Sequence, residues 1–169
     1  YILRDHHVVQ VVNYIPENNY NIIKKFALFR NQFLNLGVAV SLNTALSSYY
    51  DHLDAVVVGS DQVFRLAYNS VKSPNFMEWM HGKKLFISYA ASFGIDHFEG
   101  GSLARKKVSK LLSRFDAHSV RESSGVHIMK NTFGLDAIQV LDPTLLLDPK
   151  DYQPIIDSEP CAQPEKYVG

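Results

Sequence analysis

The sequence has little that would direct it to an oxidising compartment, a membrane or a nucleic acid. Cys161 is the only cysteine among 169 residues, so no disulfide can form within the chain, and a reducing compartment fits. No apolar run reaches the roughly 18 residues of a membrane-spanning helix, and the first residues do not resemble a signal peptide. Lys plus Arg and Asp plus Glu both number 17, so no net charge attracts the chain to nucleic acid. We therefore expect a globular protein with no membrane span and no nucleic-acid partner.

Several familiar catalytic motifs are also missing. The chain has no phosphate-binding loop ending in Gly-Lys-Ser/Thr, no Gly-x-Gly-x-x-Gly and no Gly-x-Ser-x-Gly. Its histidines are scattered: His6 and His7 would point to opposite faces of a strand, and His118 lies inside a predicted strand, where packing is the better interpretation. We therefore expect no metal and no cofactor.

What the sequence does have is an alternation of apolar strands and amphipathic helices. Hydrophobic residues make up 46% of the chain, enough for a core. Helical spacing predicts helices over 22–36, 101–115 and 123–131, while 42–53 is ambiguous. The predicted strands are apolar throughout: Val8–Tyr14, Ala55–Val58, Leu85–Ala90, Ala117–Val120 and Ala137–Leu141. This pattern predicts an α/β domain over 1–158, with a parallel sheet and helices on both faces, followed by a polar linker that begins at 159.

Polar residues follow four of the predicted strands. Ligands of open parallel sheets bind beyond the carboxyl ends of the strands, so these residues are candidates for a site. Gly, Ser and Asp are also the usual residues of turns and helix caps, and this plainer interpretation stays open. The segments are Gly59-Ser60-Asp61-Gln62, Ser92-Phe93-Gly94, Arg121-Glu122 and Asp142-Pro143-Thr144.

The order of four motifs gives the chain a family resemblance. They read YDHLDAVVVGSDQV from Tyr50, KKLFISYAASFG from Lys83, FDAHSVRESSG from Phe115 and VLDPTLLLD from Val140. In this order they resemble the polysaccharide pyruvyl transferase family over roughly Val8 to Gly169. One departure is local: the family commonly reads GSDQVWN, and here Phe64 and Arg65 replace Trp and Asn. Any acceptor contact made by that Asn is therefore in doubt, and Arg65 would add charge at the rim of the cleft.

The resemblance implies one Rossmann-like half of a two-domain enzyme with the GT-B arrangement. Members transfer the pyruvyl group of phosphoenolpyruvate to a sugar of a cell-surface polysaccharide or its precursor and form a pyruvate ketal. The partners implied are phosphoenolpyruvate, a glycan or lipid-linked sugar acceptor, and a C-terminal domain beyond 159–169. That domain would supply most contacts to phosphoenolpyruvate, so we expect 1–169 alone to be inactive. A cytoplasmic location, or a peripheral one at the inner face of the membrane, fits this function.

The resemblance also suggests roles for the residues of the candidate site. Asp61 is the candidate for orienting or deprotonating an acceptor hydroxyl, and Gly59 allows close approach of the backbone to a ligand. Ser60, Gln62 and Ser92 are candidates for hydrogen bonds to sugar hydroxyls. For Arg121 and Glu122 two interpretations stay open, contact with an anionic substrate or a salt bridge at a helix start. For Asp142 we favour a cap or turn.

Two other functions stay open at this point. One is a GT-B glycosyltransferase that uses a nucleotide sugar, and the other is a degenerate, non-catalytic member of the family. A nucleotide-diphosphate site in the second domain would indicate the glycosyltransferase. Cationic side chains that bind phosphoenolpyruvate there would indicate the pyruvyl transferase.

Overall fold

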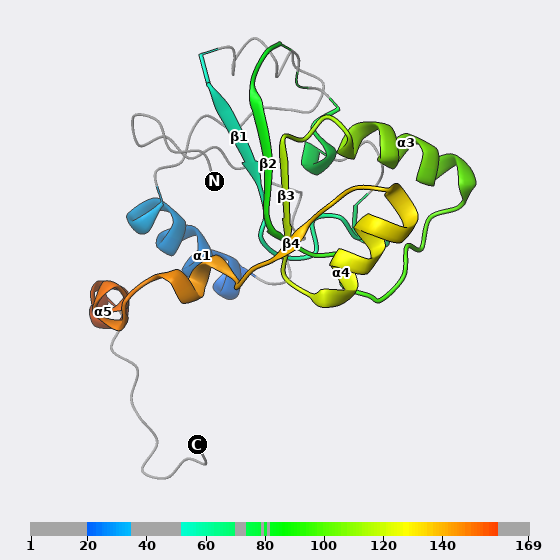
Figure 1. Ribbon diagram of the computed structural model, residues 1–169. Coiled ribbons are helices and arrows are strands. Elements are labelled where there is room, and N and C mark those ends of the chain that lie inside the picture. The colour runs from blue at the N-terminus through cyan, green and yellow to red at the C-terminus, as the bar shows by residue number, and fades with distance from the viewer. Residues whose placement is uncertain (1–19, 35–51, 70–73, 79, 81, 159–169) are drawn as a thin grey trace.

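A parallel sheet and its helices form the described part of the chain. The computed structural model describes residues 20–34, 52–69, 74–78, 80 and 82–158. Within them, one four-stranded sheet has the order β1-β2-β3-β4, accompanied by four α-helices (Figure 1). The strands are β1 (Ala55–Val58), β2 (Leu85–Ala91), β3 (Ala117–Val120) and β4 (Ile138–Gln139). The helices are α1 (Tyr20–Phe33), α3 (Ser102–Leu112), α4 (Ser123–Ile128) and α5 (Pro149–Ser158). The predicted α/β fold with a parallel sheet is confirmed.

The strand order explains the position of α3 and α4. All three strand pairs are parallel and neighbours in sequence are neighbours in the sheet. Crossovers between parallel strands are right-handed, so successive connections in one direction fall on the same face. Figure 1 shows α3 and α4 on the same side of the sheet. On the sheet itself, Leu85 and Ile138 remain 52% and 66% exposed. Helices on both faces therefore stay a prediction.

The predicted strands agree with the structure to different degrees. The segments over β1 and β3 match residue for residue, and β2 extends one residue further, to Ala91. The last predicted strand, Ala137–Leu141, is wrong in length, because only Ile138–Gln139 forms β4. β4 lies at the sheet edge and both its residues are exposed, so little packing extends it. Val8–Tyr14 lies outside the described residues, as does most of 42–53.

The helices differ from their predicted spans at their ends. α3 is shorter than 101–115, since Gly101 is its N-cap and Ser113 its C-cap. α4 ends at Ile128 and continues as a π-helical turn, η3 (Met129–Phe133), up to Gly134 at φ 69°. A left-handed glycine is a common helix stop, and this one was not predicted.

α5 was also not predicted, because Pro154 inside it discourages a helix. Its start is well capped. The Asp148 carboxylate accepts a hydrogen bond from Lys150 N at 3.1 Å, and Asp148 N donates to the Asp151 carboxylate at 3.0 Å. This reciprocal pair, with Pro149 at the first helical position, is a capping box that starts the helix despite the later proline.

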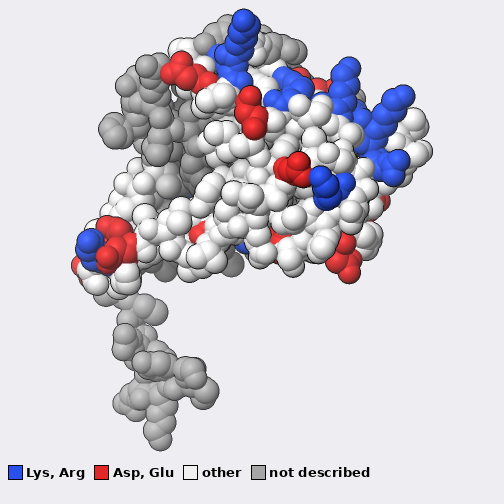
Figure 2. All heavy atoms as spheres, viewed as in Figure 1, with Lys and Arg blue, Asp and Glu red and all other residues white. Residues whose placement is uncertain are grey.

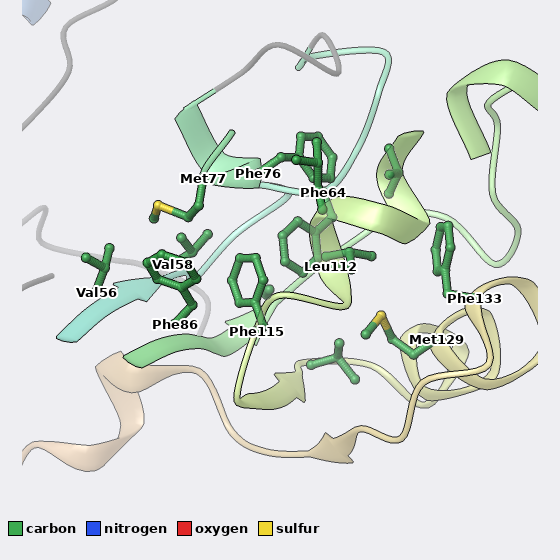
Figure 3. Packing of buried hydrophobic residues seen from close by; sticks show 14 of the residues in the cluster. Val56, Val58, Phe64, Phe76, Met77, Phe86, Leu112, Phe115, Met129 and Phe133 are labelled. Carbon is green, nitrogen blue, oxygen red and sulfur yellow. The ribbon is translucent and has the colours of Figure 1, made fainter. Parts of the chain in front are cut away.

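An aromatic core lies between the sheet and α3. Phe64 is 1% exposed, and its ring centre lies 5.5–5.6 Å from those of Phe93 and Phe76 and 6.3 Å from that of Phe115. Figure 3 shows the rings of Phe64, Phe76 and Phe115 around Leu112 of α3, with the strand side chains Val58 and Phe86 beside Phe115. Met129 and Phe133 close the core from η3. Phe64 lies at the far end of the loop that follows β1, so its burial in the core holds the loop that carries Gly59 to Gln62.

Buried serines join β2 to β3 at a bulge. The register shifts between Ser88 and Ala91, and Ala90 has φ 48°. Ser119 Oγ accepts a hydrogen bond from Ala90 N at 3.1 Å and donates to Ser88 O at 3.0 Å. The small residues of the SYAAS segment therefore allow close strand pairing, and the Ser119 hydroxyl satisfies two backbone groups at the bulge.

Charge is unevenly distributed although the chain is neutral. Figure 2 shows Lys and Arg side chains gathered where α3 lies in Figure 1. α3 carries Arg105, Lys106, Lys107 and Lys110 and no acidic residue. Of these, Lys107 pairs with Glu78 at 2.8 Å. The remaining cations give the protein a local basic surface on this helix.

Candidate active site

The four polar segments meet at one edge of the sheet, which we call the carboxyl edge. Gly59–Gln62 follows β1, Ser92–Gly94 follows β2, Arg121–Glu122 follows β3 and Asp142 follows β4. Since all four strands are parallel, their carboxyl ends lie on the same edge (Figure 1). At this edge the side chains of Asp61, Glu122 and Asp142 contact Arg121.

Backbone hydrogen bonds hold the loop after β1 against the loop after β2. Ser92 N donates to Asp61 O at 2.8 Å, and Phe64 N donates to Ser92 O at 3.1 Å. On the other side of β2, Arg121 N donates to Ala91 O at 3.1 Å. The three loops thus continue the sheet pairing past the ends of the strands, which places their side chains with little freedom.

Asp61 projects from this loop into solvent. Its backbone is left-handed at φ 63°, and its side chain is 82% exposed. Aspartate is one of the few residues that adopt this conformation readily. The carboxylate Oδ1 lies 3.7 Å from Nη2 of Arg121. An exposed acid with a fixed backbone and a guanidinium nearby can orient a hydroxyl or accept its proton.

Arg121 is held by three carboxylates. Its Nε donates to Glu122 Oε1 at 3.1 Å and its Nη1 donates to Asp142 Oδ2 at 3.1 Å, in addition to the approach of Asp61. Partial burial acts against the charged form, but the hydrogen bonds of Glu122 and Asp142 outweigh it and raise the pKa of Arg121. The salt bridge predicted at the start of α4 exists, and Asp142 extends it to the end of β4.

Asp142 has two roles. Its Oδ1 accepts hydrogen bonds from Thr144 N at 3.0 Å and Thr144 Oγ1 at 2.8 Å, which caps the short helix η4 (Pro143–Leu146). The cap predicted from the sequence is confirmed. Its other oxygen binds Arg121, which the sequence did not indicate, because β3 and β4 are brought together only by the fold. The two Thr144 bonds lower the pKa of Asp142 to about 2; burial opposes them, and Ser60 and Arg121 add smaller lowering effects.

The remaining candidates are placed differently. Ser92 is fully buried, and its Oγ accepts a hydrogen bond from Gly94 N at 2.8 Å, so it shapes a turn. Gly59 has φ 137°, and a Cβ there would lie 1.8 Å from the Tyr89 carbonyl oxygen. A glycine is required here because the backbone passes close to strand β2, and not because it approaches a ligand. Gln62 lies partly buried, with its Oε1 accepting from Arg65 at 3.0 Å.

His118 is a packed residue, as predicted. Its ring stacks on Phe115 at 5.4 Å between centres, and burial lowers its pKa despite a backbone contact with Leu112. A histidine that stays neutral at the edge of an aromatic core has no evident part in acid–base chemistry.

A family comparison agrees with this geometry. The family described as polysaccharide pyruvyl transferase matches residues 1–168, nearly the whole chain. The chain belongs to the polysaccharide pyruvyl transferase family. The resemblance stated from the four motifs is thereby confirmed, and the family is one of transferases. No curated protein and no solved structure matches the chain at a significant level.

The described part of this pyruvyl transferase family member offers neither a membrane span nor a metal site. Within the residues that the structure describes, no helix has the length and apolar character to cross a bilayer. Over the same part of the chain, no group of three or more His, Cys, Asp or Glu side chains is arranged to bind a metal ion. The carboxylates at the carboxyl edge surround Arg121 instead.

Proposed function

We propose that this protein transfers the pyruvyl group of phosphoenolpyruvate to a sugar of a cell-surface polysaccharide or its precursor, forming a pyruvate ketal. The observation that carries the proposal is the exposed Asp61 carboxylate at the carboxyl edge, 3.7 Å from Arg121, in a chain that matches the family from end to end. We further propose that residues 1–158 form the N-terminal domain of a GT-B arrangement and that 159–169 lead to a second domain. The reaction would take place in the cytoplasm or at the inner face of the membrane.

The chemistry sets the demands on the protein. Protonation of the methylene carbon of phosphoenolpyruvate gives an oxocarbenium-like centre at C2, which one sugar hydroxyl attacks. Attack by a second hydroxyl of the same sugar expels phosphate, so C2 gains two bonds to sugar oxygens and loses two, the π bond to the methylene carbon and the bond to the phosphate oxygen. One hydroxyl proton balances the proton added to the methylene carbon and the other leaves with phosphate. A base that takes a hydroxyl proton as the oxygen attacks speeds this process.

The charge at the carboxyl edge favours the acceptor over the donor. Three carboxylates, those of Asp61, Glu122 and Asp142, surround the single guanidinium of Arg121. Phosphoenolpyruvate carries a phosphate and a carboxylate, and an excess of negative charge disfavours its approach. A neutral sugar is not repelled, and its hydroxyls can donate to Asp61. We therefore assign the acceptor to this edge and the phosphoenolpyruvate contacts to the second domain.

Within this assignment, Asp61 accepts or orients the attacking hydroxyl. Arg121 acts on Asp61 rather than on substrate: its guanidinium lies 3.7 Å from the carboxylate and limits where the carboxylate can lie. Glu122 and Asp142 hold Arg121 in turn. Ser60, which contributes to the low pKa of Asp142, belongs to the same positioning group.

Replacement of Asp61 by asparagine tests the proposal. Asp61→Asn in the full-length enzyme keeps the size of the side chain and tolerates the left-handed backbone, but it removes the charge and the basic oxygen. We expect phosphate release from phosphoenolpyruvate in the presence of a competent sugar acceptor to fall by about 10²–10⁴-fold with an unchanged melting temperature. Asp136→Asn is the control, because Asp136 is 90% exposed and pairs only with Lys130 in the described structure. Equal rates in Asp61→Asn and Asp136→Asn would refute the role of Asp61.

A further inference from the structure

Arg65 lies at the centre of a side-chain cluster on the segment that follows Asp61 in the chain. Its Nη1 donates to Gln62 Oε1 at 3.0 Å, and its Nε lies 3.9 Å from Glu99 Oε1. The guanidinium carbon lies 4.6 Å from the centre of the Tyr68 ring, with Nη1 3.4 Å from the Tyr68 hydroxyl. One arginine thus contacts an amide, a carboxylate and an aromatic ring.

Gln62 is confined between Arg65 and Gly94. Gly94 has φ 70°, and a Cβ at this position would lie 2.3 Å from Gln62 Oε1. Because Oε1 accepts from Arg65, the NH₂ group is the end of the amide that can donate elsewhere. Gln62 follows Asp61 in the chain, so this donor and the exposed carboxylate belong to the same loop. A fixed side chain loses little conformational entropy when it binds a ligand.

Tyr68 presents a flat surface on the same loop. Its residue is 69% exposed, and one face of its ring is covered by the Arg65 guanidinium. The loop itself is held by Asn69, whose N donates to Arg65 O at 2.9 Å and whose Nδ2 donates to Gln62 O at 3.0 Å. An exposed tyrosine that is held in place offers an apolar face and a polar tip. A pyranose offers the matching chemistry, a face of C–H groups bordered by hydroxyls.

We propose that Tyr68, Arg65 and Gln62 form a subsite for the pyranose ring of the acceptor, next to Asp61. Tyr68 packs against the C–H face of the sugar, Gln62 donates to one of its oxygens, and Arg65 positions both side chains. This inference rests on the proposed function, in which the acceptor binds at the carboxyl edge. The subsite proposal names the residues that select the sugar. It also gives a role to Arg65, at a position where the family commonly has asparagine.

Sugar binding can be measured without turnover. Methyl glycosides of glucose, galactose, mannose and N-acetylmannosamine are the probes, and saturation-transfer NMR with the full-length protein reports which of them bind. We expect at least one glycoside to receive saturation in the wild type. In Tyr68→Ala we expect its dissociation constant to rise by about 3- to 10-fold, as for loss of one aromatic contact. Tyr68→Phe keeps the ring and should stay within about 2-fold of the wild type, because the lost hydroxyl adds little to stacking.

Matched variants separate a sugar contact from a structural role. Phe26→Ala removes another exposed aromatic ring, 64% exposed on α1, and should leave glycoside binding unchanged. Arg65→Gln should weaken glycoside binding while the KM for phosphoenolpyruvate stays at its wild-type value. Equal binding by Tyr68→Ala and the wild type, or no glycoside binding by the wild type, overturns the subsite. Loss of glycoside binding in Tyr68→Ala supports the subsite. If the wild type binds a glycoside but releases no phosphate from phosphoenolpyruvate, only the proposed reaction is overturned.

Discussion

At the scale of single residues, the site depends on how charges are paired. Asp142 caps η4 with one oxygen and binds Arg121 with the other, so one side chain connects the end of β4 to the end of β3. Its hydrogen bonds favour the ionised carboxylate and lower its pKa to about 2. A carboxylate with a depressed pKa stabilises the fold only while it is ionised, which makes this connection sensitive to acid.

The acid dependence of stability tests the role of Asp142. The pKa is lowered on folding, so the stabilisation is fully present above the unfolded value of about 3.9 and is lost as the pH falls toward about 2. We expect Asp142→Asn to melt at a lower temperature than the wild type at pH 7, and the difference to shrink between pH 4 and pH 2. Melting curves of both proteins from pH 7 to pH 2 measure it. A difference that is constant over this range would contradict ionic pairing at Asp142.

At the scale of elements, the loop after β1 depends on its glycine. Gly59 passes so close to β2 that any Cβ would overlap the Tyr89 carbonyl, and its φ of 137° is itself unfavourable for other residues. This close passage lets Asp61 O accept from Ser92 N and lets Phe64 N reach Ser92 O. The position of Asp61 therefore follows from packing between two strand ends.

Substitution of this glycine separates close packing from backbone conformation. Gly59→Ala combines a positive φ with a clash against backbone, and we expect it to lower the free energy of unfolding by at least about 3 kcal/mol. Gly134→Ala is the comparison, since Gly134 also has a positive φ of 69° but nothing lies within 4 Å of its Cβ position. Only the cost of the left-handed conformation applies there, about 1–2 kcal/mol. Urea denaturation measures the free energy of unfolding of both variants. Equal decreases in this free energy would mean that packing at Gly59 is unimportant.

At the scale of the whole molecule, aromatic packing ties the site to the core. Phe64 lies three residues after Asp61 and is almost completely buried among the rings of Phe76, Phe93 and Phe115. Phe93 follows Ser92 at the end of β2, so both loops of the carboxyl edge are anchored in the same cluster. The stability of the domain and the geometry of the site therefore depend on the same residues.

Truncation of Phe64 should accordingly affect the whole domain. We expect Phe64→Ala to lower the free energy of unfolding by about 3–5 kcal/mol, through lost burial and the cavity left among three rings. Leu103→Ala on α3 is the control, because Leu103 is 84% exposed and its truncation should change stability by about 0.5 kcal/mol or less. Chemical denaturation of the two variants gives the comparison. Similar losses for both would mean that the aromatic cluster is not the main core.

The sequence by itself determined the α/β class, the parallel sheet, the cores of β1, β2 and β3, and the family. It could do so because these depend on local patterns: apolar runs of strand length, helical spacing and motifs in a fixed order. It also located Asp61, Arg121 and the cap at Asp142, because each lies in a motif next to a strand end. The sequence prediction made β4 too long, because the apolar pattern did not show that this strand lies exposed at the sheet edge. It missed α5, because the capping box starts this helix despite the proline inside it.

Only the tertiary structure decided what these residues contact. Three carboxylates share Arg121 because strand ends far apart in the chain meet at one edge. The inward turn of Ser92 and the contacts of Arg65 with Gln62 and Tyr68 depend on the exact course of single loops. Periodicity reports whether a residue faces a core, but it carries no information about which side chain from another strand will meet it. Those pairings come from the parallel register, which brings the carboxyl ends of β1, β2, β3 and β4 to one edge and makes separate turns into one site.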